Sequence, residues 1–232
     1  MNNVKNLNFY KTKTGNYWLP DPNKDRVLID IVSNRIFDEE IVNTALNYIK
    51  FGDNVLDIGS NFGQMAVLFS KAVGAGKVVS FEADPWIYKV FQKNILENGC
   101  RNVISYNNAV WDKTGEILLY PEADFSKFDS WGSFGIDPTA TAGQKIKSIK
   151  IDDINLPRPI KLIKIDIQGA DLNALKGSKN LILTDKPIIL FEHEELFDKQ
   201  FNTSWKDYED FFKEINYNIE KISINNYKAT SL

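Results

Sequence analysis

The chain has 232 residues, of which 43% are hydrophobic and 25% are charged, and this composition is typical of one globular domain. A formal net charge of −3 gives no electrostatic basis for binding nucleic acid or an anionic membrane. We expect no membrane span and no signal peptide, because no apolar run is long enough and the N-terminal residues are polar. A single cysteine, Cys100, excludes an internal disulfide and favours a reducing cytoplasm.

The N-terminal part of the chain contains two short apolar runs, at residues 16–20 and 26–32. The turn-prone sequence DPNKD at 21–25 separates them, so the pattern predicts a hairpin. We expect residues 1–35 to form a hairpin extension of a larger domain at 36–232, with the two parts making one structural unit.

Strands and helices then alternate along the chain. A helix is expected from Asp38 to Ile49, where acidic residues precede apolar residues at helical spacing. Further helices are predicted at 62–73, 86–99, 174–183 and 208–215, and strands at 54–59, 77–83, 102–110, 116–120, 160–167, 186–194, 217–223 and 226–230. This order predicts an α/β fold with a mostly parallel sheet, helices on both faces and an antiparallel hairpin at its edge. Residues 122–144 show no periodicity and are expected to form a loop.

The first predicted strand ends in the sequence DIGSNFG, residues 57–63. Glycines let a ligand approach the backbone, and the amides at the start of the next helix favour a carboxylate. Asp57, in contrast, would repel a pyrophosphate and attract a cation. S-adenosylmethionine (SAM) offers both charges, since it combines a zwitterionic amino acid with a sulfonium. The motif also differs from the G-x-G-x-x-G pattern of dinucleotide-binding proteins and lacks the lysine of a P-loop.

The next two strand ends carry further candidate cofactor contacts. Glu82 follows Gly63 at close to the ~20-residue spacing at which an acidic residue meets ribose hydroxyls. A small side chain after the third strand is suited to flank an adenine. The predicted cofactor contacts are Asp57, Gly59, Ser60, Asn61, Gly63, Glu82, Ala83, Asn108 and Ala109. The alternatives are that Asp57 satisfies loop amides, that Glu82 is a solvated charge and that Asn108 forms a turn.

Four segments resemble the FkbM-type SAM-dependent methyltransferases. They are VLDIGSNFG (55–63), FEADP (81–85), IKIDIQGAD (163–171) and IILFEHE (188–194), and the similarity runs from about residue 36 to near the C-terminus. The resemblance implies a Rossmann-like methyltransferase fold with a seven-stranded sheet, and O-methylation of a hydroxyl, with sugars and polyketides among known acceptors. It also implies that Asp57, Gly59 and Glu82 contact SAM. Gln168 departs from the family, whose motif has a glutamate there, and keeps hydrogen-bonding capacity without the charge.

Methylation of a hydroxyl needs a base or a metal beside the acceptor oxygen. Asp166, Glu192 and His193 lie at the ends of two later strands and are the catalytic candidates. His193 titrates near neutral pH and suits a general base, or it is a satisfied polar residue. Because side chains alternate along a strand, Glu192 and His193 are expected to face opposite sides. A Mg²⁺ ion held by these three residues is a less favoured alternative.

The acceptor pocket is the least defined part of the sequence. Trp131 and Phe134 in the predicted loop, together with Tyr17, are candidates to stack on a sugar ring, and equally to serve as packing residues. Gln168 is a candidate polar contact to the acceptor.

The sequence as a whole predicts a SAM-dependent O-methyltransferase. The resemblance, together with the aromatic loop, implies a small-molecule or saccharide acceptor, in bacterial glycan or secondary-metabolite biosynthesis. Two other functions stay open at this point, a SAM-binding regulatory domain without catalysis and an NAD-dependent oxidoreductase.

Overall fold

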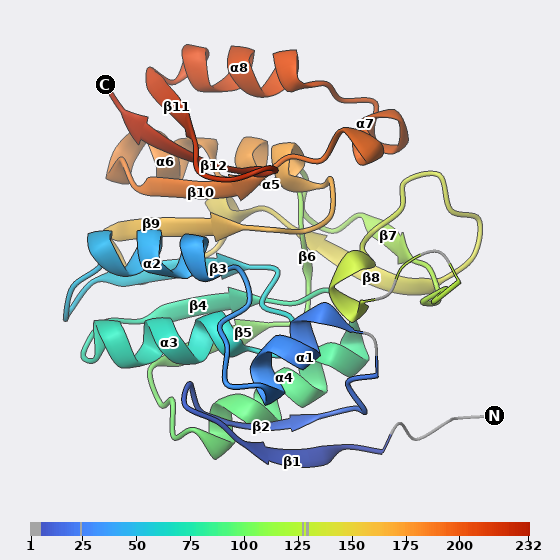
Figure 1. The fold of residues 1–232 in the computed structure, drawn as a ribbon. Helices are drawn as coiled ribbons and strands as arrows, with labels where there is room; N and C mark the ends of the chain where they lie inside the picture. The colour runs from blue at the N-terminus through green and yellow to red at the C-terminus, as the bar shows by residue number, and fades with distance from the viewer. Residues whose placement is uncertain (1–5, 24, 127, 129) are drawn as a thin grey trace.

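The centre of the molecule is a seven-stranded sheet with the order β11-β12-β10-β9-β3-β4-β5 (Figure 1). The computed structural model describes residues 6–23, 25–126, 128 and 130–232. The strands are β3 (Asn54–Ile58), β4 (Val78–Phe81), β5 (Val103–Tyr106), β9 (Ile160–Ile165), β10 (Ile188–Glu192), β11 (Tyr217–Lys221) and β12 (Asn226–Ser231). Six of them run in the same direction, whereas β12 is antiparallel to both of its neighbours, β10 and β11. The predicted α/β fold with its closing antiparallel hairpin is confirmed.

The strand order reverses direction at β3. From β3 the chain moves outward through β4 and β5, and it later returns to the other side of β3 as β9. The carboxyl ends of β3 and β9 are therefore neighbours, with Ile58 paired to Ile165 and Asp57 paired to Lys164. In open α/β sheets, ligands bind outside the carboxyl ends of the strands at such a switch point.

Helices cover both faces of the sheet, as predicted (Figure 1). They are α2 (Glu39–Tyr48), α3 (Gln64–Val73), α4 (Pro85–Glu97), α5 (Asp171–Gly177), α6 (Lys179–Asp185), α7 (Glu195–Phe201) and α8 (Trp205–Glu214). Successive strand residues point to opposite faces. Leu56 and Ile163 pack in the core cluster that contains residues of α5, α6 and α8, whereas Val55 and Leu162 pack in the cluster that contains residues of α2 and α3.

The N-terminal hairpin differs from the prediction in its second arm. It joins β1 (Asn8–Lys11) to β2 (Asn16–Leu19), while Arg26–Val32 forms helix α1. The apolar run at 26–32 is equally compatible with a short helix, in which Val27, Leu28 and Ile31 lie on one buried face. The Asp25 side chain caps the start of this helix by accepting a hydrogen bond from the Leu28 amide. The hairpin and α1 share a core cluster with α4. The domain boundary at residue 36 stays a prediction.

Four further features of the secondary structure differ from the prediction. The strand expected at 102–110 is divided into β5 and β6 (Ala109–Val110), and β6 leaves the main sheet to pair with β8 (Gln144–Ile149). β8 was not predicted, and it pairs on its other side with β7 (Ile117–Tyr120). The helix expected at 174–183 is two helices that meet at Ser178, whose hydroxyl donates to the Ala174 carbonyl. Helix α7 was also missed.

Within the described ranges, no helix is long and apolar enough to cross a membrane. Among the described residues of the predicted loop at 122–144, Trp131–Ser133 form a 3-10 turn, η1, which lies beside the carboxyl ends of the strands.

Candidate active site

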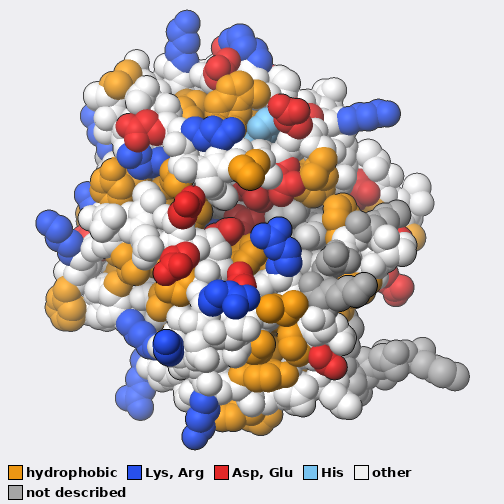
Figure 2. Space-filling view, viewed as in Figure 1, with side chains coloured by type: hydrophobic (Ala, Val, Ile, Leu, Met, Phe, Trp, Pro, Cys, Tyr) orange, Lys and Arg blue, Asp and Glu red, His pale blue; other side chains and the backbone are white. Residues whose placement is uncertain are grey.

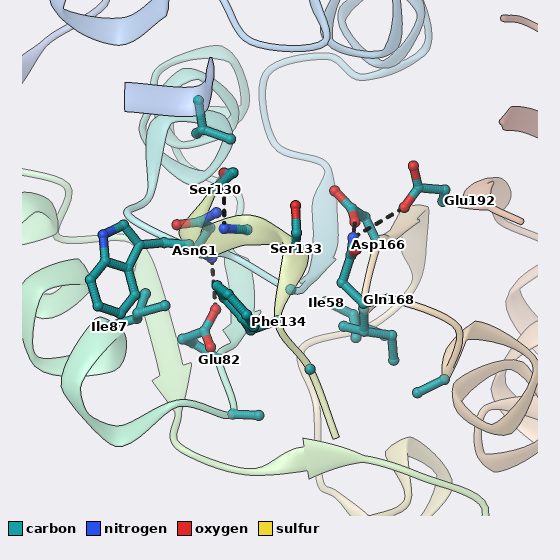
Figure 3. Close-up of a pocket in the computed structure, with 18 of the residues that line it drawn as sticks. Ile58, Asn61, Glu82, Ile87, Ser130, Ser133, Phe134, Asp166, Gln168 and Glu192 are labelled. Atoms are coloured by element: carbon teal, nitrogen blue, oxygen red, sulfur yellow. Dashed lines mark hydrogen bonds between the residues drawn. The ribbon is translucent and has the colours of Figure 1, made fainter. Parts of the chain in front are cut away.

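A cavity of about 500 Å³ lies at the carboxyl ends of β3, β4, β9 and β10, where the strand order reverses. Its volume is in the range of small-molecule and cofactor sites. Loop residues 130–136 and the turn between β11 and β12 complete its wall. Figure 3 shows Asn61 and Glu82 on one side of the cavity and Asp166, Gln168 and Glu192 on the other. The face drawn in Figure 2 has acidic side chains gathered around a hollow near its centre.

The glycine turn after β3 forms the wall nearest α3. Gly59 has a φ of +83°, and a Cβ atom there would lie 1.9 Å from the Asp166 carbonyl oxygen, so a side chain is excluded. The turn then brings the Asn61 amide to Glu82, with a hydrogen bond of 2.8 Å to Oε2. The first two parallel strands are thus joined at their carboxyl ends by a backbone donor and a carboxylate.

Glu82 is buried, and each of its carboxylate oxygens accepts one backbone amide. Oε2 accepts from Asn61, and Oε1 accepts from the Asp84 amide at 2.9 Å. Burial raises the pKa of Glu82 to about 7. Each oxygen retains a second lone pair, and Glu82 lines the cavity, so it can accept further hydrogen bonds from a ligand.

Six of the nine predicted cofactor residues line the cavity, and three lie behind its wall. The lining residues are Gly59, Asn61, Glu82, Ala83, Asn108 and Ala109. Asp57, Ser60 and Gly63 are not among the lining residues, and the Ser60 hydroxyl donates to the Asp57 carbonyl at 3.0 Å. Contact of Asp57 with a cofactor stays a prediction, since its side chain lies outside the cavity lining.

Asp57 instead faces Lys164, a buried lysine in the middle of the sheet. Lys164 Nζ lies 3.8 Å from Asp57 Oδ1 and 3.5 Å from Asp166 Oδ2, and it donates to the Gly59 carbonyl at 2.7 Å. Neither Asp57 carboxylate oxygen has a hydrogen-bond partner among the described residues, and burial raises the pKa of this carboxyl. Burial alone would lower the pKa of Lys164, but the Asp166 and Asp57 carboxylates raise it above its ordinary value.

Sequence reasoning missed Lys164, although a signal was present. Residues 162–165 of β9 are all buried, and Lys164 is the one charged residue among them. A buried charge in such a strand requires an opposite charge nearby, and Asp57 lies directly across on β3. The lysine links the glycine turn to the acidic side chains at the end of β9.

The opposite side of the cavity carries two carboxyl groups joined by an amide. Gln168 Nε2 donates to Asp166 Oδ1 at 3.0 Å and to Glu192 Oε2 at 3.2 Å (Figure 3). Burial raises the pKa of Glu192 well above its ordinary value, and the nearby Asp166, Asp171 and Glu194 carboxylates add to this effect. Glu192 therefore keeps its proton at neutral pH. Burial also raises the pKa of Asp171, to about 7.

Two charged residues of the N-terminal segment also line this cavity and were missed as site residues. Asp38 precedes α2 with a left-handed φ of 50°, and burial, followed by the charge of Asp166, raises its pKa to about 6. Arg26 begins α1 and is exposed. From the sequence, Asp38 was predicted only to begin a helix, because its neighbours in the chain give no sign that it lies near the ends of distant strands.

His193 does not lie in the cavity wall. Its ring is buried against Trp205 and Tyr208, with centroids 5.4 and 4.9 Å away, and its Nε2 lies 2.9 Å from Asp198 Oδ1. Glu192 lines the cavity and His193 does not, so alternation along the strand assigns them different surroundings. The catalytic role for His193 is thereby corrected.

The structure also bears on the Mg²⁺ alternative. Asp166, Glu192 and His193 do not converge, since the histidine lies outside the cavity lining. No group of three or more His, Cys, Asp or Glu side chains in the described part of the chain is arranged to hold a metal ion.

The aromatic acceptor candidates are divided between two places. Trp131 and Phe134 line the cavity. The backbone amide of Trp131 donates to the buried Asp25 carboxylate at 2.7 Å, which ties the loop to the start of α1. Tyr17, in contrast, is fully buried in the core between β2 and α4, so its proposed contact with the acceptor is corrected.

The fold and the cavity are those of a SAM-dependent methyltransferase. Residues 57–219 match the model of the methyltransferase FkbM domain, and the chain belongs to this family. Family membership implies SAM as the cofactor.

Solved structures agree with the fold. Methyltransferase FkbM from Methylobacillus flagellatus KT superposes with a TM-score of 0.54 and 17% identity, covering 79% of this chain and 45% of that chain. A precorrin-6y C5,15-methyltransferase from Geobacter metallireducens GS-15 has a TM-score of 0.52 and 14% identity, with coverages of 84% and 91%. A Streptococcus mutans protein in complex with SAH, S-adenosylhomocysteine, has a TM-score of 0.51 and 10% identity, with coverages of 84% and 97%.

A curated relative is a sugar-acid methyltransferase by name. The hexuronic acid methyltransferase AglP of Haloferax volcanii is 24% identical over 161 residues, which cover 67% of this chain and 62% of that protein. The matched part is thus less than two thirds of that relative's length.

Proposed function

We propose that this chain transfers a methyl group from SAM to a hydroxyl oxygen of an uncharged saccharide. The observation that carries the proposal is that one continuous cavity is lined by Glu82 on one side and by Asp166 on the other. The first is the strand-end carboxylate suited to ribose hydroxyls, and the second is a carboxylate suited to take a proton.

The residues on the Glu82 side fit SAM. Glu82 retains acceptor capacity for the ribose, and Ala83 and Ala109 leave room for an adenine between small side chains. The carboxylate-rich lining favours a ligand with an ammonium and a sulfonium, and it disfavours the pyrophosphate of NAD. When bound, SAM supplies an electrophilic methyl group on a positively charged sulfur.

Asp166 is the proposed general base. One of its oxygens faces Lys164 and the other accepts from Gln168, so the carboxylate is held in place. Glu192 holds its own proton and is not available as a base. The acceptor hydroxyl gives its proton to Asp166 while its oxygen forms the bond to the methyl carbon. The electron pair of the breaking carbon–sulfur bond remains on sulfur.

The remaining wall suits a sugar without a carboxylate. Trp131 and Phe134 offer aromatic surface for the C–H face of a ring, and the Asn225 and Asn226 positions add polar groups. Asp38, Asp166 and Glu194 line the same cavity, and Arg26 is the single basic residue among its described lining residues. A hexuronic acid, the substrate class in the name of the relative, would bring a further negative charge to this wall.

The test is methyl transfer from labelled SAM to a panel of neutral hexoses, amino sugars and hexuronic acids. We expect transfer to a neutral sugar, in an ether linkage that survives mild alkali. An alkali-labile product on a hexuronic acid would show esterification of a carboxylate and contradict the proposal. Tight SAH binding without transfer to any acceptor would favour a SAM-binding domain without catalysis.

A further inference from the structure

Gln168 connects the two carboxyl groups on the Asp166 side of the cavity (Figure 3). An amide nitrogen carries two N–H donors, and here one is directed to Asp166 and one to Glu192. These residues come from the ends of neighbouring strands, β9 and β10. A single neutral side chain therefore sets the relative position of the two acidic groups.

The backbone at Gln168 is held in an uncommon conformation. Its φ is +55°, in the left-handed region that non-glycine residues seldom adopt. A Cβ atom on Gly135 would lie 3.1 Å from the Gln168 Cβ, so the backbone of the loop after η1 packs closely over it. Such conformations persist where the surroundings hold them, and they concentrate at functional sites. The conformation and the close packing both restrict where the amide can point.

The two oxygens of Asp166 have different partners because of this amide. Oδ2 lies 3.5 Å from Lys164 Nζ, and Oδ1 accepts from Gln168 at 3.0 Å. Removing the amide would leave Oδ1 without this donor and would place two acidic groups side by side. The carboxylate would then be free to rotate toward Lys164, away from a substrate in the cavity.

We propose that Gln168 is a positioning residue for methyl transfer, and that its carboxamide holds the Asp166 carboxylate toward the acceptor hydroxyl while keeping Glu192 beside it. This inference rests on the proposed function. A glutamate at the same position would have the same shape but no donor. It would complete a set of three carboxyl groups of the kind that binds Mg²⁺ through hard oxygen ligands.

The test compares the wild type with Gln168→Glu and Gln168→Leu. Gln92→Glu is the matched control, since it removes an amide donor to Tyr88 on the exposed surface of α4, outside the cavity lining. Turnover, KM for the sugar, SAH affinity and thermal midpoint are measured for each, followed by calorimetric titration with Mg²⁺. Both Gln168 variants should lose about 10- to 100-fold in kcat, the effect expected of a misplaced catalytic group.

The other readouts separate positioning from a structural role. SAH affinity and thermal midpoint should stay near the wild-type values in both Gln168 variants, and Gln92→Glu should match the wild type throughout. Gln168→Glu alone should bind Mg²⁺. An unchanged kcat in both Gln168 variants, or parallel loss of folding and SAH binding, would overturn the inference. Absence of methyl transfer by the wild type to any hydroxyl would instead overturn the proposed function, and the positioning role with it.

Discussion

The two sides of the cavity hold their carboxylates in different ways. Glu82 accepts two backbone amides, from Asn61 and Asp84, that belong to the turns after β3 and β4. Asp166 and Glu192 are held mainly by side chains, Gln168 and Lys164, that come from the end of β9. The proposed cofactor side therefore depends on the path of the backbone, whereas the proposed acceptor side depends on the identity of a few side chains. Substitutions on the two sides should have separable effects.

The largest expected effect is on turnover. Asp166→Asn keeps the shape and the contact with Gln168 but cannot take a proton. We expect kcat to fall by about 10²- to 10⁴-fold, the range for loss of a general base. SAH affinity should change little, because Asp166 lies on the acceptor side. Steady-state kinetics with labelled SAM measures kcat, and calorimetry measures SAH affinity. An unchanged kcat in Asp166→Asn would exclude Asp166 as the base.

Lys164 joins the two sides, so its replacement should affect folding. Lys164→Met leaves Asp57 and Asp166 without their buried counter-charge, and breaking a buried pair from one side costs about 3–5 kcal/mol. Urea unfolding measures the loss. Adding Asp57→Asn should restore part of the stability by removing the stranded charge. Equal stability of Lys164→Met and the wild type would show that the lysine is not charged in the folded protein.

The pH dependence of stability tests the cofactor side. The pKa of Glu82 is raised from 4.5 to about 7, so the folded state binds its proton more tightly than the unfolded state does. The contribution of Glu82 to the free energy of unfolding is therefore fully present below about pH 4.5 and is lost as the pH rises through about 7. Between pH 5 and 8 the wild type should lose about 2–3 kcal/mol more than Glu82→Gln. Parallel curves for the two proteins would contradict a raised pKa.

The smallest expected effect concerns the loop. Trp131→Ala removes one aromatic face from the acceptor wall but leaves the backbone amide that contacts Asp25. We expect KM for the sugar to rise about 3- to 10-fold, as for loss of one stacking contact, with SAH affinity unchanged. A change in SAH affinity without a change in KM would place the acceptor elsewhere.

The same contrast explains what could be predicted from the sequence. The β3 and β4 strand ends are local motifs, so the sequence could predict that Gly59, Asn61 and Glu82 lie together at the cavity. Asp38 and Lys164 were missed as site residues because their roles depend on contacts between strands and segments distant in the chain. Tyr17 and His193 were misplaced because residue type suggested a function where packing decides the position. The run at 26–32 is too short for periodicity to distinguish a strand from a helix.

The measurement that tests this account most directly is calorimetric titration of SAH into the wild type, Glu82→Ala and Asp166→Asn, each shown to be folded. The account predicts binding to the wild type and to Asp166→Asn with similar affinity, and binding about 10- to 100-fold weaker to Glu82→Ala, as expected for lost hydrogen bonds to a charged group. Equal affinity in all three, or a loss confined to Asp166→Asn, would contradict the assignment of the cofactor to the Glu82 side of the cavity.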